Sequence, residues 1–281
     1  MLAVARAFQR ANVQTNGTVY FVGDVGEEGP GNLRGTRYLF TNSLKGKIDY
    51  FISVDGTGLD LKHHGVGSKR YRVTYKGPGG HSYGAFGIPN PIHALGRAIA
   101  QIAAVQVPVT PKTTFNVGVI SGGTSVNSIP FSGTMDLDMR SETAEALAAV
   151  DQQVLKILAG ALDAENGRWT TQTGARGERA KLSLVIDTIG IRPANSMQTD
   201  SSRIVATALA AGRPLGFAPK TGASSTDANL PMSLGVPAIA IDGGGSGTGA
   251  HSLGETYDDG ASGWLGPQWA ALIVAALAGV R

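Results

Sequence analysis

Hydrophobic positions along the chain recur with two periods, which predict helices alternating with strands. Apolar side chains at helical spacing predict a helix over residues 2–11, and a β-branched and aromatic run predicts a strand at 18–22. A helix is then predicted over 34–44 and a buried strand over 48–54. Strand, helix and strand, with polar residues where the strands end, predict an α/β fold with a site at the carboxyl edge of its sheet.

The pattern changes near residue 68 and returns near residue 190. The intervening part predicts strands at 71–76, 114–121, 133–140 and 182–189, and helices at 88–105 and 143–163. The resulting βαββαβ order predicts a ferredoxin-like sandwich. Such a unit is self-contained and leaves a sheet face or edge exposed for pairing with another copy. We therefore predict an α/β domain built from residues 1–67 and 191–281, interrupted by an inserted domain at 68–190.

Helical and strand periods resume in the last third of the chain. They predict helices at 201–211, 228–234 and 267–280, and a strand at 237–241. The strand leads into a glycine-rich loop that ends at His251. The final helix carries Ala, Leu, Ile and Val at helical spacing, which predicts that it closes the α/β domain.

Composition narrows the classes of protein. The 281 residues are 42% hydrophobic and 16% charged, and 24 basic against 21 acidic residues give a net charge of +3. The Lys and Arg residues are scattered, so a nucleic-acid surface is not indicated, and no apolar stretch has the 18 or more residues that a membrane span needs. The chain has no cysteine, so a metal site would depend on His, Asp and Glu. Localisation is not fixed by the sequence, with the cytoplasm slightly favoured.

Two adjacent carboxylates, Glu27 and Glu28, open the glycine-rich turn that follows the first predicted strand. A strand that ends in such a turn fixes its last side chains, so one acid can ligate a cation while the other handles a proton. Acidic residues in a Gly/Pro-rich turn are also typical of solvated loops, and the pair alone does not separate the two interpretations.

Five histidines can be weighed individually. His93 lies inside a predicted helix and is interpreted as structural, and the adjacent His63 and His64 are interpreted as a surface turn. His81 follows Gly79-Gly80 in a tight turn. His251 ends the loop 243–249, where glycines let the backbone approach a ligand, and Glu255 is placed to orient its ring. That loop lacks Walker and dinucleotide signatures and fits a nest for a substrate carboxylate.

Seven motifs in order carry a resemblance to a known family. They are Gly26-Glu27-Glu28-Gly29, Asp55 after a strand, Gly79-Gly80-His81-Ser82, residues 122–130, residues 136–140, residues 225–228 and Gly249-Ala250-His251-Ser252. In this order they resemble the co-catalytic zinc peptidases and amidohydrolases, which include peptidase T, the glutamate carboxypeptidases, aminoacylase and the succinyl-diaminopimelate desuccinylases. The resemblance covers nearly the whole chain and implies a catalytic α/β domain with a ferredoxin-like dimerisation insert.

The resemblance also implies roles for single residues. Glu27 would be the general base, Glu28 and His251 would bind one zinc ion, and Asp55 would bind the other. In the insert, His81 and Asn127 would stabilise a tetrahedral oxyanion in the active site of a partner subunit of a homodimer. A small peptide or N-acylated amino acid would be the substrate, with its carboxylate held by Arg140 and by the loop around Gly244 and Gly245.

Two parts of the family's pattern have no match in this sequence. The family has a His-x-Asp upstream of the acid pair and a later Asp that bridges both metals, whereas no His precedes His63 here. Catalytic zinc usually takes three protein ligands, so the two-zinc site is expected to be incomplete in a chain that lacks the family's N-terminal piece. Asp24 lies near the acid pair but, at a strand end, is poorly placed to bridge two ions.

Three functions therefore compete at the level of sequence. The first is a metal-dependent amide hydrolase represented by an N-terminally truncated chain. The second is a non-catalytic dimerising or ligand-binding remnant of such an enzyme. The third, a structural or nucleotide-binding α/β protein, requires every motif match to be accidental.

Overall fold

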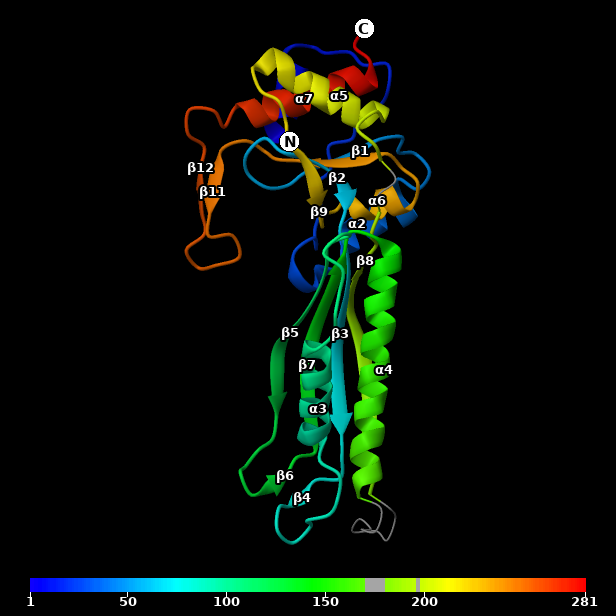
Figure 1. Cartoon of the computed structure of the whole chain (residues 1–281). Helices are drawn as coiled ribbons and strands as arrows, with labels where there is room; N and C mark the ends of the chain where they lie inside the picture. Colours follow the sequence, from blue (N-terminus) through cyan, green and yellow to red (C-terminus); the bar gives the residue numbers. More distant parts are fainter. Residues whose placement is uncertain (170–179, 196–197) are drawn as a thin grey trace. The chain divides into compact units, whose positions relative to one another are not determined.

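The computed structural model describes residues 1–169, 180–195 and 198–281, and it contains two compact units. Unit 1 consists of Met1–Val66 and Arg192–Arg281, and unit 2 is Gly67–Ile191 (Figure 1). Each unit has a hydrophobic core of its own. The α/β fold with a ferredoxin-like insert is confirmed.

Unit 1 is built on a mixed four-stranded sheet. Its strands are β1 (Phe51–Val54), β2 (Leu61–Gly65), β9 (Thr221–Ser224) and β10 (Ala238–Ile241), in the order β1-β10-β2-β9. β1 is parallel to β10 and β2 is parallel to β9, while β10 and β2 are antiparallel. Because β1 and β10 are parallel, the residues that follow them, Asp55 and Asp242, lie at the same edge of the sheet.

Helices cover both faces of this sheet, and the sequence of β10 shows why. Ile239 and Ile241 point to one face, where they pack with α1 (Leu2–Arg10), α5 (Arg203–Gly212) and α7 (Leu265–Ala278). Ala238 and Ala240 point to the other face and pack with Met232 of α6 (Asn229–Ser233). A strand that is buried on both faces reads as an uninterrupted apolar run, which is how 237–241 was recognised.

Three of the remaining unit 1 helices directly follow the acid pair in sequence, namely η1 (Gly29–Gly31), α2 (Arg34–Tyr38) and η2 (Leu39–Ser43). A further short helix, η3 (Arg213–Leu215), follows α5. Leu33, Leu39 and Phe40 form a small core with Leu230. This core fixes the position of the chain directly after the acid pair.

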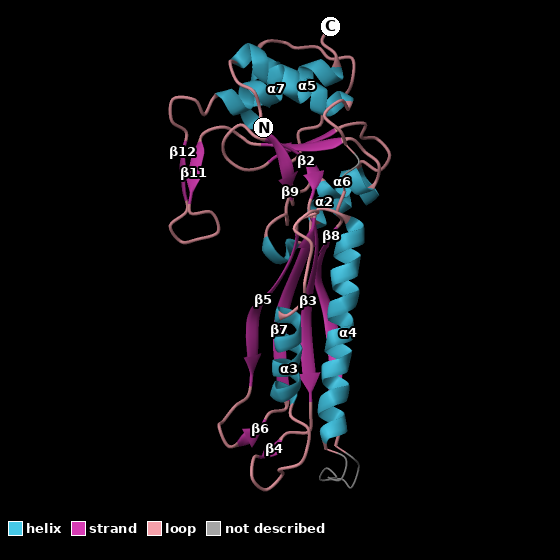
Figure 2. Cartoon of the chain, in the orientation of Figure 1, coloured by secondary structure: helices cyan, strands magenta, loops and turns pink. Residues whose placement is uncertain are grey.

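Unit 2 has the ferredoxin-like arrangement (Figure 2). Its main strands are β3 (Gly67–Lys76), β5 (Thr113–Gly122), β7 (Ser132–Ser141) and β8 (Ser183–Arg192), in the order β5-β7-β3-β8. The helices α3 (Pro91–Ala103) and α4 (Ala144–Arg168) pack against this sheet and share one core with it. Residue 192 ends β8 but belongs to unit 1, so the chain re-enters unit 1 at Arg192.

Strand β7 explains the charged motif at residues 136–140. Buried and half-buried side chains alternate along the strand, so Met135, Leu137 and Met139 face the core. The charged residues between them face the opposite way, where Asp136 pairs with Arg72 and Asp138 pairs with Arg70 on β3. Each of these ion pairs is 2.7 Å long.

Two predictions of local structure are wrong. Residues 18–22 join no sheet among the described residues, because apolar and β-branched character does not make a strand without a hydrogen-bonding partner. His63 and His64 lie in β2, not in a surface turn. Pairing with β9 and β10 draws this polar segment into the sheet, and His63 is only 5% exposed.

Two short two-stranded sheets complete the fold. β4 (Gly80–His81) pairs with β6 (Ser128–Ile129) in unit 2, and β11 (Ser246–Thr248) pairs with β12 (Thr256–Asp258) in unit 1. Each of these sheets carries a segment that the sequence singled out, namely His81 with its glycines and the loop before His251. Across the described parts of the chain, none of the helices combines the length and apolar character that crossing a membrane requires.

Candidate functional site

The turn that carries Glu27 and Glu28 depends on glycine. Gly26 has a φ of +80°, in the left-handed region that glycine tolerates, and its carbonyl accepts a hydrogen bond of 2.9 Å from the Leu33 N–H. A Cβ on Gly31 would lie 2.3 Å from that same carbonyl oxygen, so the close approach excludes any other residue there. The turn thus folds back on itself and presents the two acids from a closed loop.

Glu27 is held by Arg192. The Nη1 of Arg192 donates to Glu27 Oε1, and its Nη2 donates to the main-chain carbonyl of Glu27. The Glu27 side chain is 21% exposed and the Arg192 side chain 6%. Burial raises the pKa of Glu27, although the guanidinium of Arg192 opposes that shift. The predicted general base is therefore half-buried and has one carboxylate oxygen already engaged.

Asp24, near the acid pair, contacts Asp227 through a shared hydroxyl. Thr36 Oγ1 forms hydrogen bonds to Asp24 Oδ2 and to Asp227 Oδ1. A hydroxyl carries one proton, so it can donate to one carboxylate only, and the second contact needs a proton on the other carboxyl. Burial raises the pKa of Asp227 to about 7, and the charges of Asp24 and Glu27 add to the shift. Asp24 is thus engaged with Thr36 in this structure.

Asp55 lies at the carboxyl edge of the unit 1 sheet, as the α/β pattern predicted. Its N–H donates to the carbonyl of Ile241 at 3.0 Å, which aligns the ends of β1 and β10. Burial raises the pKa of Asp55, and the charge of Glu28 raises it further. The side chain of Asp242, at the same edge, accepts a hydrogen bond of 2.8 Å from the Asp60 N–H.

His251 lies in the loop between β11 and β12, with a φ of +64°. Its backbone N–H donates to Glu255 Oε2 at 3.4 Å. Glu255 therefore contacts the main chain of His251, whereas the sequence suggested that it would orient the ring. His251 is exposed, but its charge acts on the Asp55 carboxyl and lowers the pKa of that group.

The glycine-rich loop before His251 makes close backbone contacts within unit 1. The Gly244 N–H donates to the carbonyl of Gly58 at 3.0 Å, and Gly244 and Gly245 both have positive φ, +94° and +66°. A Cβ on Gly244 would lie 2.2 Å from the Gly263 carbonyl. These glycines thus allow a close backbone crossing, and their role towards a substrate carboxylate stays a prediction.

Two of the candidate metal ligands, Glu28 and Asp55, line one cavity, and His251 is not among the residues that line it. A cavity of about 690 Å³ in unit 1 is lined by Glu27, Glu28 and Asp55, together with apolar residues of β1 and α7. The charges of Glu28 and His251 both act on Asp55. Yet within residues 1–169, 180–195 and 198–281 no three His, Asp or Glu side chains are grouped closely enough to hold a metal ion. The donors present therefore do not fit a complete zinc centre.

Unit 2 brings His81 and Asn127 together. His81 pairs with Ser128 across the two-stranded β4–β6 sheet, and the Ser82 N–H donates to the carbonyl of Asn127 at 2.9 Å. The backbone N–H groups of Tyr83 and Gly84 both donate to His81 Nδ1, at 3.3 Å each. Because an N–H can only donate, Nδ1 is the acceptor and the proton of the neutral ring lies on Nε2. His81 thus presents an Nε2–H donor.

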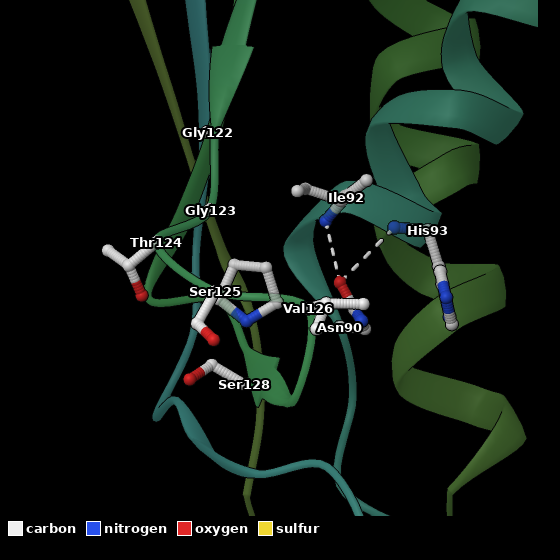
Figure 3. A pocket seen from close by; sticks show the side chains of 10 residues that line it. Asn90, Ile92, His93, Gly122, Gly123, Thr124, Ser125, Val126 and Ser128 are labelled. Atoms are coloured by element: carbon white, nitrogen blue, oxygen red, sulfur yellow. Dashed lines mark hydrogen bonds between the residues drawn. The ribbon is translucent and has the colours of Figure 1, made fainter.

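Arg140 and the loop beside Asn127 complete the predicted site residues of unit 2. Arg140 is 40% exposed and its Nε donates to Asp138 Oδ2 at 2.7 Å. A pocket of about 460 Å³ is lined by Val126 and Ser128, the two neighbours of Asn127 in sequence, and the N-terminus of α3 forms one wall of it (Figure 3). Asn90 Oδ1 already accepts hydrogen bonds from the N–H groups of Ile92 and His93 at this helix start.

Sequence reasoning missed three residues of the unit 1 site. Arg192 was an isolated cation at a strand end, Thr36 was one polar position in a helix, and Asp227 was part of a motif without an assigned role. All three are buried. For Arg192 and Asp227 the available signal was a charge inside an otherwise apolar pattern, because burial of a charge requires a partner. Thr36, which carries no charge, offered no such signal.

A family model describes part of this chain. Residues 65–166 match the peptidase dimerisation domain of the M20 family. The succinyl-diaminopimelate desuccinylase of Burkholderia mallei is 29% identical over 168 residues, which are 56% of this chain and 44% of that protein. The chain therefore spans less than half the length of the curated relatives that it matches.

Solved structures resemble the chain over a larger part of its length. The aminopeptidase PepT of Bacillus cereus is 17% identical, with a TM-score of 0.71 over 96% of this chain and 67% of that one. A dinuclear metal-binding M20 peptidase of Bacillus subtilis is 19% identical, with a TM-score of 0.63 over 100% of this chain and 70% of that one. At these identities the likeness concerns the fold.

Proposed function

From the resemblance of this chain to the M20 peptidases and amidohydrolases, we propose that it hydrolyses the amide bond of a small peptide or an N-acylated amino acid. The resemblance supports amide hydrolysis in general. The observation that carries the proposal is the placement of Glu27 in the unit 1 cavity, beside Glu28 and Asp55. A half-buried carboxylate with a raised pKa is suited to accept a proton near neutral pH.

The chain's own residues divide the reaction between them. Glu27 takes the proton from the attacking water through Oε2, since Oε1 is bound by Arg192. His81 donates through Nε2–H to the oxygen that becomes negative, and Asn127 beside it supplies a second donor. We propose that both act in the active site of the partner in a homodimer, which the match to a dimerisation domain supports. Arg140 binds the substrate carboxylate with its exposed guanidinium.

Metal binding is the incomplete part of the proposal. Glu28 and His251 are the proposed ligands of one ion and Asp55 of the other, and zinc is the proposed metal. These donors do not complete a site within the described residues, so we propose that further ligands come from a chain of the relatives' length. A bound metal ion would lower the pKa of water and polarise the scissile carbonyl.

Substitution of the base tests the proposed reaction. Glu27→Gln keeps the size of the side chain but cannot accept the proton, so amide hydrolysis should fall ~10²-fold or more. The assay measures release of amino acids from dipeptides and N-acylated amino acids by the chain extended to the length of its relatives. Glu145→Gln, an exposed acid on α4, is the matched control and should leave the rate unchanged. An unchanged rate in Glu27→Gln would remove Glu27 from the mechanism.

The incomplete metal site favours a second candidate, a non-catalytic dimerising remnant. The two functions differ in what the 281-residue chain should do. A remnant should form a dimer in light scattering yet retain no zinc after dialysis and hydrolyse nothing, even when extended to the relatives' length. The enzyme should gain both zinc and activity on extension. Tight binding of two zinc ions by the 281-residue chain itself would contradict the incomplete site.

A further inference from the structure

Arg192 contacts one residue, Glu27, at two separate points. Nη1 reaches the carboxylate oxygen Oε1, and Nη2 reaches the main-chain carbonyl of the same residue. Nη1 also donates to the carbonyl of Ser225 at 3.1 Å. Arg192 is 5% exposed, and its Nε is buried without a partner among the described residues, so its terminal nitrogens Nη1 and Nη2 make the contacts that hold it.

Holding a side chain at its tip and at its backbone fixes the torsions between them. A planar guanidinium offers its N–H groups in one rigid fork, so both contacts can be satisfied with only a narrow set of Glu27 rotamers. Oε1 is then turned towards the interior of unit 1, and Oε2 is the oxygen left for another partner. Loss of one member would leave a buried charge without its counter-ion, which strongly favours keeping the pair together.

The segment behind Arg192 is itself firmly placed. Asn229 donates from Nδ2 to the carbonyls of Val66 and Pro193, at 2.9 Å each, and its Oδ1 accepts from the Thr226 N–H at 2.8 Å. Asn229 is fully buried. Pro193 directly follows Arg192, so the backbone of Arg192 is tied to the same framework as Ser225.

A second connection joins this segment to the acid-pair turn. Asp227, two residues after Ser225, meets Asp24 through the hydroxyl of Thr36. The turn is therefore connected to residues 225–227 on both sides of its glycine, by Asp24 through Thr36 before Gly26 and by Glu27 through Arg192 after it. Neither connection uses Glu28, whose side chain is exposed.

We propose that Arg192 is a positioning residue that fixes the carboxylate of Glu27 for proton transfer. This inference rests on the proposed function, because it assigns Arg192 a role through Glu27 and no contact with substrate. It explains why a buried cation stands at the point where the chain re-enters unit 1. The arginine orients one oxygen of the base by occupying the other.

Crystal structures of the wild type, Arg192→Met and Arg192→Lys test the positioning without any need for turnover. In Arg192→Met the Glu27 side chain should occupy several rotamers or a different one. In Arg192→Lys it should keep the ion pair but lose the simultaneous contact to its own carbonyl, because an ammonium is a point donor. A Glu27 side chain that stays unmoved in both variants would overturn the inference, whatever the activity of the protein.

A double-mutant cycle in the chain extended to the relatives' length separates positioning from general stability. Arg192→Met should lower kcat by ~10–100-fold with KM changed less than about threefold, since displacement of a catalytic group by about 1 Å has effects of this size. In a Glu27→Gln background the same change should lower kcat no further. An equal drop in both backgrounds would overturn the inference, and Arg192→Lys takes the place of Arg192→Met if the latter does not fold.

The two arms keep the proposals apart. If the wild-type sequence, extended to the relatives' length, hydrolyses no amide substrate, the proposed function fails. The crystal structures still decide whether Arg192 positions Glu27. If hydrolysis depends on Glu27 but not on Arg192, the proposed function stands and the positioning role is rejected.

Discussion

Replacement of Trp269 by Ala should destabilise unit 1 by about 4 kcal/mol, because large-to-small changes of a buried aromatic typically cost about 3–5 kcal/mol. Trp269 has no exposed surface and lies on α7 against Ile204 and Ala208 of α5. Its Nε1 donates to the Ala208 carbonyl at 2.8 Å, and its ring meets Phe217 edge to face at 5.4 Å. The variant therefore loses packing, one aromatic pair and one hydrogen bond together.

A loss of this size is a large part of the stability of a domain, which is typically about 5–15 kcal/mol. Hydrogen exchange followed by mass spectrometry is the suitable measurement, since a chain of two units need not unfold in one step. Exchange should accelerate in unit 1 and not in unit 2. Trp264→Ala is the matched control, because Trp264 is 54% exposed and its Nε1 donates to the nearby Ala261 carbonyl. Equal effects of the two substitutions would contradict the assigned core.

Replacement of Glu165 by Gln should destabilise unit 2 by about 2–3 kcal/mol at neutral pH, the range for buried hydrogen bonds to a charged group. Glu165 has no exposed surface, and its carboxylate accepts from the Asn90 N–H, the Trp169 Nε1–H and the Arg97 guanidinium. A glutamine amide turns donors towards Arg97, which has only donors to offer. The substitution is close in shape, so the loss reports the charge and its hydrogen bonds.

The same residue should give unit 2 a dependence on pH. Burial opposes the charged form, but the hydrogen bonds from Asn90, Trp169 and Arg97 outweigh it and lower the pKa of Glu165. A lowered folded-state pKa adds stability above the ordinary Glu value of ~4.3 and loses it as pH falls from there through the lowered value. Denaturation of the wild type should show this loss and Glu165→Gln should lack it. Asp163→Asn, exposed on the same helix, is the control, and a wild-type profile in Glu165→Gln would refute the assignment.

Sequence periodicity predicted the elements that are buried by their own pattern. The helices α4 and α7 and the strands β7 and β10 have apolar positions at the right spacing, so local pattern and tertiary packing agree. The ferredoxin-like insert followed from their order. Elements that depend on a distant partner were not predictable in this way. β9, with the sequence Thr-Gly-Ala-Ser, has no strand period and is a strand only because β2 pairs with it.

The candidate site shows the same division. Glu27, Glu28, Asp55, His81 and Asn127 were found through motifs, and the structure shows that the last two lie beside each other in unit 2. Whether any of them is catalytic stays a prediction. Arg192 lies 165 residues from Glu27 in sequence, and a single arginine carries no spacing that could have paired the two.

The backbone bridge between Gly65 and Asn195 has a consequence for how such a chain evolves. The two residues exchange N–H to carbonyl hydrogen bonds of 2.8 and 3.0 Å, one just before the chain leaves unit 1 and the other just after it returns. The chain therefore leaves and re-enters unit 1 at a single insertion point, as in a hairpin whose tip has been replaced by 125 residues from Gly67 to Ile191. Because the two ends of the insertion lie side by side, the inserted domain can be lengthened, exchanged or lost by recombination while the sheet of unit 1 keeps its register.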